Sequence, residues 1–297
     1  MAYFDILTDS TCDLTVEQAE QQDVTILPVG VNVGSSSFMH YADWRELSRR
    51  DFYAALRSGL KVGTSATAPA YWLDAMEASL KNGRDVIAVP LSSTLTAGYN
   101  NARIAAAELR EAYPERKIIV LDSICASLGT AILLKQLATW RVEGMSMQDA
   151  ALHAESSKMR IVHLFTVDSL DHLRRGGRIS ATSAIIGSVL AVKPILNFDT
   201  EGKISVISKA RGRKNAIREV ASYAEKQSRG EGRKEFYISH ADCPEDAERL
   251  AEAVRAVCPG AEITINCMAP ALSAHCGPGG VALFFAGKRP KGIIRKG

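Results

Sequence analysis

The chain has 297 residues and a formal net charge of +3; hydrophobic residues make up 46% of it and charged residues 23%. This balance excludes a disordered or fibrous protein, and the length suffices for two domains with separate cores. Since no apolar run approaches the ~18 residues of a membrane-spanning helix, and the N-terminus lacks the pattern of a secretory signal, we expect a cytoplasmic protein.

The first half alternates short apolar stretches with segments in which apolar residues recur at helical spacing. Such alternation predicts a parallel, doubly wound α/β layer. Strands are expected over 3–7, 24–33, 86–89 and 117–122, and helices over 15–22, 43–59, 69–82, 99–113, 126–142 and 146–159.

Two hydroxyl-rich segments, 63–69 and 92–98, precede expected helices. Thr64 and Ser65 lie in the first, and Ser92, Ser93 and Thr96 lie in the second. A helix N-terminus leaves unpaired N–H groups and a partial positive charge, so it favours an anion, and ligands gather beyond the carboxyl ends of parallel strands. The two turns therefore predict a small site for an oxyanion such as a carboxylate. The alternative is that these hydroxyls only cap the helices.

From about residue 160 the pattern changes to strands joined both by hairpins and by helices. Strands are expected over 161–167, 193–198, 203–208, 235–239, 261–267 and 280–285, and helices over 168–175, 180–191, 209–228 and 243–257. This mixture predicts an α+β second domain. We place the division between residues 1–158 and 159–297, where no flexible linker separates the two domains.

Motifs of conventional enzymes are absent from the sequence. It has no phosphate-binding P-loop, no dinucleotide fingerprint, no His-Glu-x-x-His zinc motif and no Gly-x-Ser-x-Gly nucleophile turn. The six cysteines form no Cys-x-x-Cys pair, so neither a zinc site nor a disulfide framework is expected. Cys125, in a strand-to-helix turn, is a weak candidate for a reactive thiol, since no histidine is near it in the sequence.

Charge is distributed unevenly along the chain. Residues 1–150 carry 13 Lys and Arg against 18 Asp and Glu, whereas the remainder carries 23 against 15. Within 172–218 there are ten basic residues and two acidic ones. This bias indicates an anionic partner. Nucleic acid is disfavoured because no recognition motif or aromatic stacking pattern accompanies the basic stretch.

Several short motifs, taken in order, resemble the DegV family of bacterial proteins. The resemblance spans almost the whole chain. The matching segments are 8–13, 63–65, 91–93, 121–123, 165–168, 174–179, 193–196 and 275–279. It implies a two-domain fold that holds one long-chain fatty acid between the domains. Some members of the family are fatty-acid-binding subunits of bacterial fatty acid kinase, in which a separate ATP-binding subunit phosphorylates the bound carboxylate.

The resemblance assigns roles by position. The carboxylate would be held by Thr64 or Ser65 and by the hydroxyls of Ser92, Ser93 and Thr96, with His275 facing it. The family's Thr-Ser-Gln-Pro reads Thr-Ser-Ala-Thr-Ala here, so Ala66 removes an amide, whereas Thr96 keeps a hydroxyl where the family has Ser. No catalytic residue and no cofactor other than the bound lipid is implied.

The basic side chains would lie at the entrance or face a partner. They are Arg174, Arg178, Arg211 and Arg213. The partner would be the ATP-binding kinase subunit, with transient contact to a membrane surface. Two other functions remain open at this point. One is an acyl or phosphoryl enzyme with a Ser or Thr nucleophile, to which His275 could be brought by folding. The other is a nucleic-acid-associated regulator that uses residues 172–218.

Overall fold

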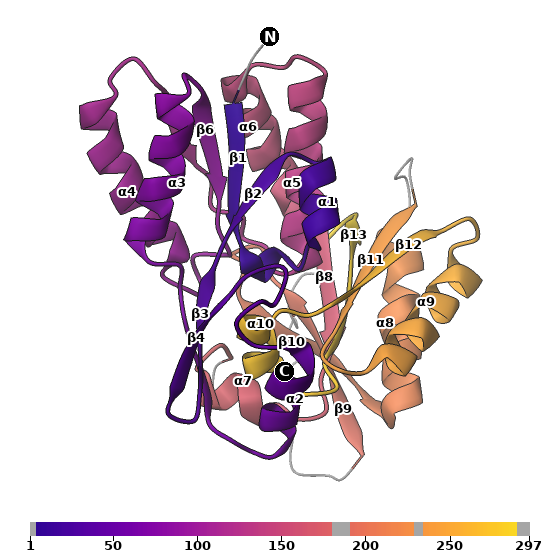
Figure 1. Ribbon diagram of the computed structural model, residues 1–297. Helices are drawn as coiled ribbons and strands as arrows, with labels where there is room; N and C mark the ends of the chain where they lie inside the picture. The colour runs from indigo at the N-terminus through magenta and orange to yellow at the C-terminus, as the bar shows by residue number, and fades with distance from the viewer. Residues whose placement is uncertain (1–3, 180–190, 229–233, 290–297) are drawn as a thin grey trace.

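The computed structural model describes residues 4–179, 191–228 and 234–289. Figure 1 shows two lobes, one built around a parallel sheet from the first half of the chain and the other around a larger sheet from the second half. Within the described ranges, no helix combines the length and apolar character needed to cross a bilayer.

The parallel sheet has the strand order β2-β1-β6-β7. Its strands are β1 (Phe4–Asp9), β2 (Val24–Leu27), β6 (Asp85–Val89) and β7 (Ile118–Val120). Its helices are α1 (Val16–Gln21), α3 (Pro69–Lys81), α4 (Gly98–Ala112), α5 (Leu128–Val142) and α6 (Met147–Ser157), with the short 3-10 helix η1 (Ser10–Cys12) directly after β1. Neighbouring residues of β6 belong to different core clusters. Val86 and Ala88 share a cluster with residues of α3 and α4, whereas Ile87 and Val89 share one with residues of α5. Since successive side chains of a strand point to opposite faces, both faces are covered by helices, as the sequence predicted.

A small antiparallel sheet of order β4-β3-β5 was not predicted. It consists of β3 (Val29–Val33), β4 (Ser36–His40) and β5 (Val62–Ser65). Helix α2 (Arg49–Arg57) lies between β4 and β5 in the chain. The single strand expected over 24–33 is two strands that meet at Pro28, which has no N–H for a ladder. The expected helix 43–59 begins only at Arg49, after the N-cap Ser48. Residues 63–65, expected as a turn, instead pair with β3.

The second sheet has six strands in the order β10-β9-β8-β13-β11-β12, antiparallel except for the pair β11 and β12. The strands are β8 (Ile161–Thr166), β9 (Val192–Phe198), β10 (Ile204–Arg211), β11 (Glu235–His240), β12 (Glu262–Cys267) and β13 (Val281–Ala286). The helices are η2 (Lys158–Arg160), α7 (Asp171–Arg175), α8 (Arg213–Gln227), α9 (Pro244–Val257) and α10 (Pro270–Cys276).

Two helices of the second half differ from the prediction, and a third expected helix lies almost entirely outside the described residues. The helix expected from 209 begins at Arg213, because residues up to Arg211 continue strand β10. Helix α10 was not predicted, although Pro270 occupies the first helical position, where proline is favoured. The helix expected over 180–191 lies, apart from residue 191, outside the described residues.

Helix α5 connects the two sheets through one continuous core. It contacts β1 of the parallel sheet and β8, β11 and β13 of the larger sheet. Its buried leucines, Leu128, Leu133, Leu134 and Leu137, belong to a cluster that also contains Phe165 and Phe284. Among the described strands none is shared between the sheets, so we retain the division at residues 158 and 159 as a proposed domain boundary.

Candidate functional site

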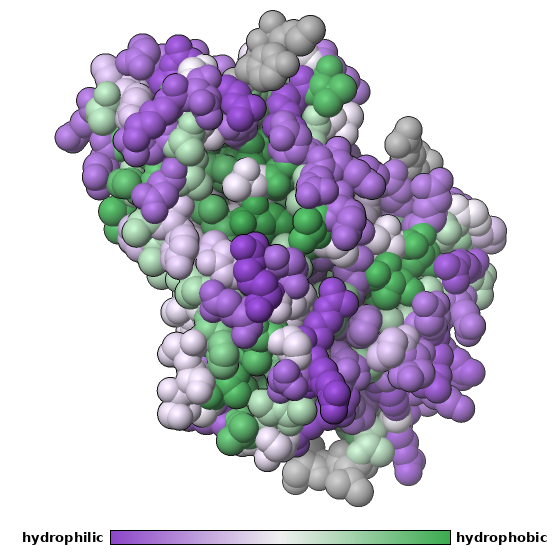
Figure 2. All heavy atoms as spheres, viewed as in Figure 1, coloured by the Kyte–Doolittle hydropathy of each residue, from purple (hydrophilic) through white to green (hydrophobic). Residues whose placement is uncertain are grey.

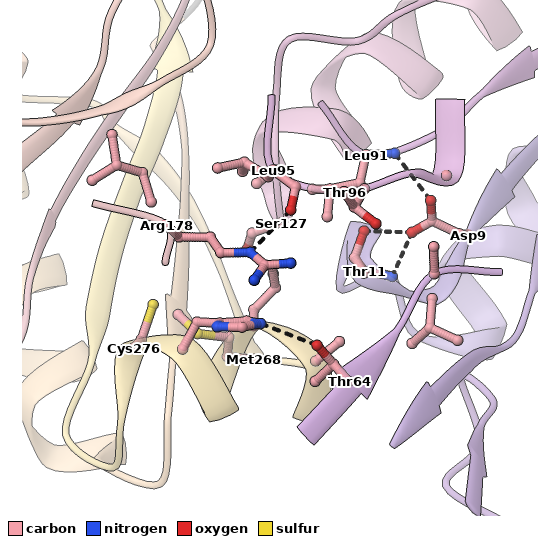
Figure 3. Close-up of a pocket in the computed structure, with 18 of the residues that line it drawn as sticks. Asp9, Thr11, Thr64, Leu91, Leu95, Thr96, Ser127, Arg178, Met268 and Cys276 are labelled. Atoms are coloured by element: carbon pink, nitrogen blue, oxygen red, sulfur yellow. Dashed lines mark hydrogen bonds between the residues drawn. The ribbon is translucent and has the colours of Figure 1, made fainter. Parts of the chain in front are cut away.

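A cavity lies between the two sheets and encloses about 930 Å³ of space, its solvent-open mouth included. Its walls come from both halves of the chain, and Figure 3 shows 18 of the residues that line it. The polar lining residues include Asp9, Thr11, Thr64, Ser65, Thr67, Thr96, Ser127, Arg178 and His275. The remainder of the wall is mainly aliphatic and aromatic.

One group of polar residues, Thr64, Arg178 and His275, forms what we call the polar cluster. Thr64 stands on β5 and His275 on α10, and Thr64 Oγ1 lies 3.0 Å from His275 Nε2. Burial, followed by the charge of Arg178, lowers the pKa of His275 to about 4. The imidazole is therefore neutral at neutral pH. Arg178 donates from Nε to the carbonyl of Leu95 at 3.1 Å, so its guanidinium is held beside the second hydroxyl-rich segment (Figure 3).

The close packing of α7 against α10 orients His275. A Cβ built on Gly176 would overlap His275 Nδ1, and one built on Gly277 would lie 2.6 Å from a ring carbon of His172. Glycine at these two positions lets the backbone approach both rings. The ring of His275 is thereby held between Gly176 on one side and Thr64 on the other.

Asp9 and Thr11 line the cavity but were not predicted as site residues. Asp9 accepts hydrogen bonds from the backbone N–H of Leu91 at 3.0 Å and of Thr11 at 3.1 Å, and from the Thr11 hydroxyl. Burial raises the pKa of Asp9. Asp9 thus ties β1 to the loop after β6. The signal available in the sequence was two acidic residues, Asp9 and Asp13, directly after a buried strand.

The second hydroxyl-rich segment contributes only one of its three predicted ligand residues to the cavity lining. That residue is Thr96. Ser92 is buried, and its Oγ lies 3.0 Å from Thr94 Oγ1. The Ser93 hydroxyl donates to Asp122 Oδ2 at 2.5 Å. The structure therefore turns Ser92 and Ser93 away from the cavity and toward protein acceptors.

The capping alternative is wrong for the two helices in question. The N-cap of α3 is Ala68 and that of α4 is Ala97, and neither helix has a side-chain capping bond. The hydroxyls of Thr64 and Thr96 are therefore not used as helix caps. Ser65, like Thr64, lies on β5 and lines the cavity.

Of the four predicted arginines, only Arg178 lines the cavity. Arg174 is exposed and pairs with Asp171 at 3.5 Å, and Arg211 is exposed on β10. Arg213 is different, because its Nε lies 2.7 Å from Asp246 in a pair of which both side chains are largely buried. Arg213 is thus committed to an ion pair and is not available to a partner as predicted.

Four rings that also line the cavity, His163, Phe165, Phe198 and Phe284, form what we call the aromatic cluster. His163 stacks on Phe198 with ring centroids 4.6 Å apart and meets Phe284 edge-on at 5.3 Å. Burial holds the pKa of His163 well below its usual value. Its Nδ1 lies 3.1 Å from the Ile161 carbonyl, and its Nε2 accepts from the N–H of Ala126 at 3.2 Å. Both nitrogens are engaged by backbone, so the ring faces the cavity as an apolar surface.

Neither a reactive thiol nor a metal centre emerges from the residues that the structure describes. Cys125 is buried, and burial raises the pKa of its thiol to about 12, which opposes the thiolate that nucleophilic attack requires. Within the described ranges, no group of three or more His, Cys, Asp or Glu side chains is arranged to hold a metal ion.

Known proteins resemble this chain over nearly its whole length. A family model described as an uncharacterised protein of the DegV family matches residues 3–288. A DegV domain-containing protein of Clostridium perfringens is 36% identical over 287 residues, which are 97% of this chain and 98% of that protein.

Solved structures of similar fold cover nearly the whole chain. A fatty acid (stearic acid)-binding protein of Eubacterium ventriosum has a TM-score of 0.87 and 24% identity, with 96% of this chain and 98% of that one covered. A DegV family protein of Thermus thermophilus, described by its fatty acid binding, has a TM-score of 0.84 and 26% identity, with 96% and 99% covered.

Proposed function

The chain belongs to the DegV family, and from this premise we propose that it binds one long-chain fatty acid in the cavity between its two sheets. The observation that carries the proposal is the division of the cavity wall into the polar cluster and the aromatic cluster. A fatty acid has the same division, since it combines one ionised group with a long apolar chain.

The polar cluster suits a carboxylate. A buried carboxylate must be paired or hydrogen-bonded, because the charge otherwise loses its hydration without compensation. Thr64 supplies a hydroxyl donor, His275 an imidazole that is neutral in the ligand-free protein, and Arg178 the positive charge. Ser65 and Thr96 also line the cavity and add two further hydroxyls. We assign the carboxylate to this cluster. Ser92 and Ser93 are left out of the assignment because their hydroxyls hydrogen-bond to other groups of the protein.

The aromatic cluster suits the acyl chain. Each methylene removed from water contributes about 0.8 kcal/mol, so a long chain needs a continuous apolar wall. Ile204, which pairs with Phe198, and Leu91 add further apolar side chains to the cavity lining. The relatives from Eubacterium ventriosum and Thermus thermophilus, described as fatty-acid-binding proteins with this fold, support the assignment.

We further propose that the protein is a carrier whose bound carboxylate is phosphorylated by a separate ATP-binding kinase subunit in the cytoplasm. Family resemblance supports this part, together with exposed Arg174 and Arg211 on the second half of the chain. Transient contact with an anionic membrane would use the same exposed charges.

One observation favours an enzyme as the second candidate. The 3.0 Å contact between Thr64 Oγ1 and His275 Nε2 is the contact that a threonine nucleophile and its general base require. An acyl enzyme would pass through an ester on Thr64, whereas a carrier would hold the lipid without a covalent bond.

Mass spectrometry separates these functions. Protein purified from its host is weighed intact under denaturing conditions, and its organic extract is analysed for acyl chains. A carrier releases one free fatty acid per chain and has the mass of the unmodified polypeptide. An acyl enzyme, incubated with an activated acyl donor, gains the mass of the acyl group. No extracted lipid, together with no uptake of added palmitate or oleate by delipidated protein, would contradict the proposal.

A further inference from the structure

The β9–β10 hairpin forms part of the wall beside the aromatic cluster. Phe198, the last residue of β9, and Ile204, the first of β10, both line the cavity. The pairing of β9 with β8 runs from Ile195 to Asn197. Phe198 and the turn that follows therefore extend past this pairing, toward the lobe formed by the first half of the chain.

The tip of the hairpin is internally ordered. Asp199 Oδ1 accepts from the backbone N–H groups of Glu201 at 2.8 Å and of Lys203 at 3.0 Å. Gly202 has a φ of +79°, which favours glycine, and its N–H donates to the Asp199 carbonyl at 3.1 Å. The turn thus presents the buried carbonyl of Gly202 to the other half of the molecule.

The second hydroxyl-rich segment receives that carbonyl. Thr94 Oγ1 donates to Gly202 O at 2.7 Å, and Ser92 Oγ lies 3.5 Å from the same oxygen. A Cβ on Gly202 would lie 2.7 Å from Ser92 Oγ and 3.1 Å from Cβ of Ile124. The hairpin tip therefore rests directly on the loops that follow β6 and β7, with Thr94 as its principal donor.

Arg289 holds the other side of the tip. This buried arginine donates to the Asp199 carbonyl at 3.0 Å and to the carbonyls of Ile161, Ile124 and Lys158 at 2.7, 3.1 and 2.8 Å. It thereby joins the hairpin to the start of β8 and to the loop after β7.

We propose that Thr94 and Arg289 latch the β9–β10 hairpin against the first half of the chain, and that this latch sets the length of acyl chain that the cavity accepts. The inference rests on the proposed fatty acid binding. With the latch closed, Phe198 and Ile204 are fixed against the cavity. With it released, the hairpin moves outward and leaves room for a longer chain at the aromatic cluster.

Thr94→Val tests the latch because it keeps the shape of the side chain and removes its hydroxyl. Thr94 is exposed, so the change leaves the core intact. Ser93→Ala is the matched control, since Ser93 is its exposed neighbour and its hydroxyl donates to Asp122 and not to the Gly202 carbonyl. Thr94→Ser, which retains the donor, should restore the behaviour of the wild type.

The readout is the relative affinity of delipidated protein for myristate, palmitate, stearate and arachidate. Loss of one neutral hydrogen bond corresponds to a few-fold effect, so the ratio of arachidate to palmitate affinity should rise about threefold in Thr94→Val. It should rise about tenfold when Ser92→Ala is added, because both donors to the Gly202 carbonyl are then removed. Ser93→Ala should leave the ratio unchanged.

A second measurement does not depend on ligand. Amide hydrogen exchange over residues 199–204 should be faster in Thr94→Val than in Ser93→Ala. Equal exchange or an unchanged chain-length ratio in a folded Thr94→Val protein would overturn the latch. Should Thr94→Val fail to fold, Thr94→Ala against Thr94→Ser gives the same comparison. A wild-type protein that binds none of the four lipids would instead overturn the proposed function.

Discussion

Thr64 and His275 are 211 residues apart in the sequence, yet Thr64 Oγ1 and His275 Nε2 are 3.0 Å apart in the folded protein. The contact joins strand β5 of the small sheet to helix α10 of the second half. It lies at the cavity wall, so a ligand between the two lobes meets side chains from both. On the face shown in Figure 2, hydrophilic side chains predominate, and hydrophobic ones gather in patches near the middle, at the right and at the lower left.

Thr64→Val should weaken fatty acid binding without unfolding the protein. A hydrogen bond to a charged group contributes about 1.5–3 kcal/mol, which corresponds to roughly ten- to a hundredfold in affinity. Isothermal titration of delipidated protein with palmitate measures the change. Ser93→Ala removes a hydroxyl that bonds to Asp122 and should bind as the wild type does. Equal affinities for the two variants would show that Thr64 makes no contact with the carboxylate.

Gly176→Ala should weaken binding through His275. The added Cβ would overlap His275 Nδ1, so the ring must leave its position beside Thr64. The effect should disappear in a His275→Ala background, where nothing remains to be displaced. A double-mutant cycle with palmitate as ligand checks this. If Gly176→Ala lowers the affinity equally in both backgrounds, the glycine acts on the fold of α7 and not on the imidazole.

Binding of the fatty acid should be linked to proton uptake at His275. In the free protein, burial lowers the pKa of His275 to about 4, with Arg178 and His172 acting in the same direction. A carboxylate placed beside the ring favours the imidazolium and raises that pKa. Affinity should therefore increase as pH falls from about 8 to about 6, where the fatty acid is still ionised. Titrations in buffers of different ionisation enthalpy count the protons, and His275→Gln should remove the uptake.

Asp13→Asn should change how stability depends on pH. Asp13 accepts from the Ser127 hydroxyl, from Ser239 Oγ at 2.7 Å and from the Ala269 N–H at 2.7 Å. Burial raises its pKa from 3.8 to about 6. Because the folded state prefers the neutral acid, stability is lost as pH rises from about 4 to about 6, by about 3 kcal/mol at most.

Asparagine keeps one acceptor oxygen for Ala269 and can donate to both serine hydroxyls, which rotate to accept. Asp13→Asn should therefore fold and lack this pH-dependent loss. Urea unfolding of both proteins between pH 4 and 7 measures the difference. Parallel pH profiles would show that Asp13 does not take up a proton in this interval.

Arg211→Glu and Arg213→Glu should affect different properties, the first the interaction with a partner and the second the stability of the fold. Arg211 is exposed, so its reversal should leave stability unchanged and slow acyl phosphate formation by a cognate kinase subunit, with recovery at high salt. Arg213→Glu places a carboxylate against Asp246 and should cost about 2 kcal/mol of unfolding free energy. Thermal melts and kinase assays at two salt concentrations separate the effects. A salt-independent defect in Arg211→Glu would argue against a docking role.

Much of the parallel layer was predictable because its determinants are local. The apolar stretches β1, β6 and β7 and the helices between them can each be located from a window of a few residues. The small sheet was not predictable in this way. Strands β4 and β5 are short and partly polar, and they are strands because each pairs with β3.

The sequence by itself determined the fold class, the strands of the two larger sheets with most of their helices, and, through the ordered motifs, the assignment to the DegV family. Only the tertiary structure decided which hydroxyls face the cavity. Thr64 and Thr96 line it, whereas Thr94 donates to Gly202, which lies 108 residues away. A hydroxyl has the same local preference whether its acceptor is a ligand or a distant carbonyl. Its role is therefore fixed by the packing of the two halves, which no short window of sequence contains.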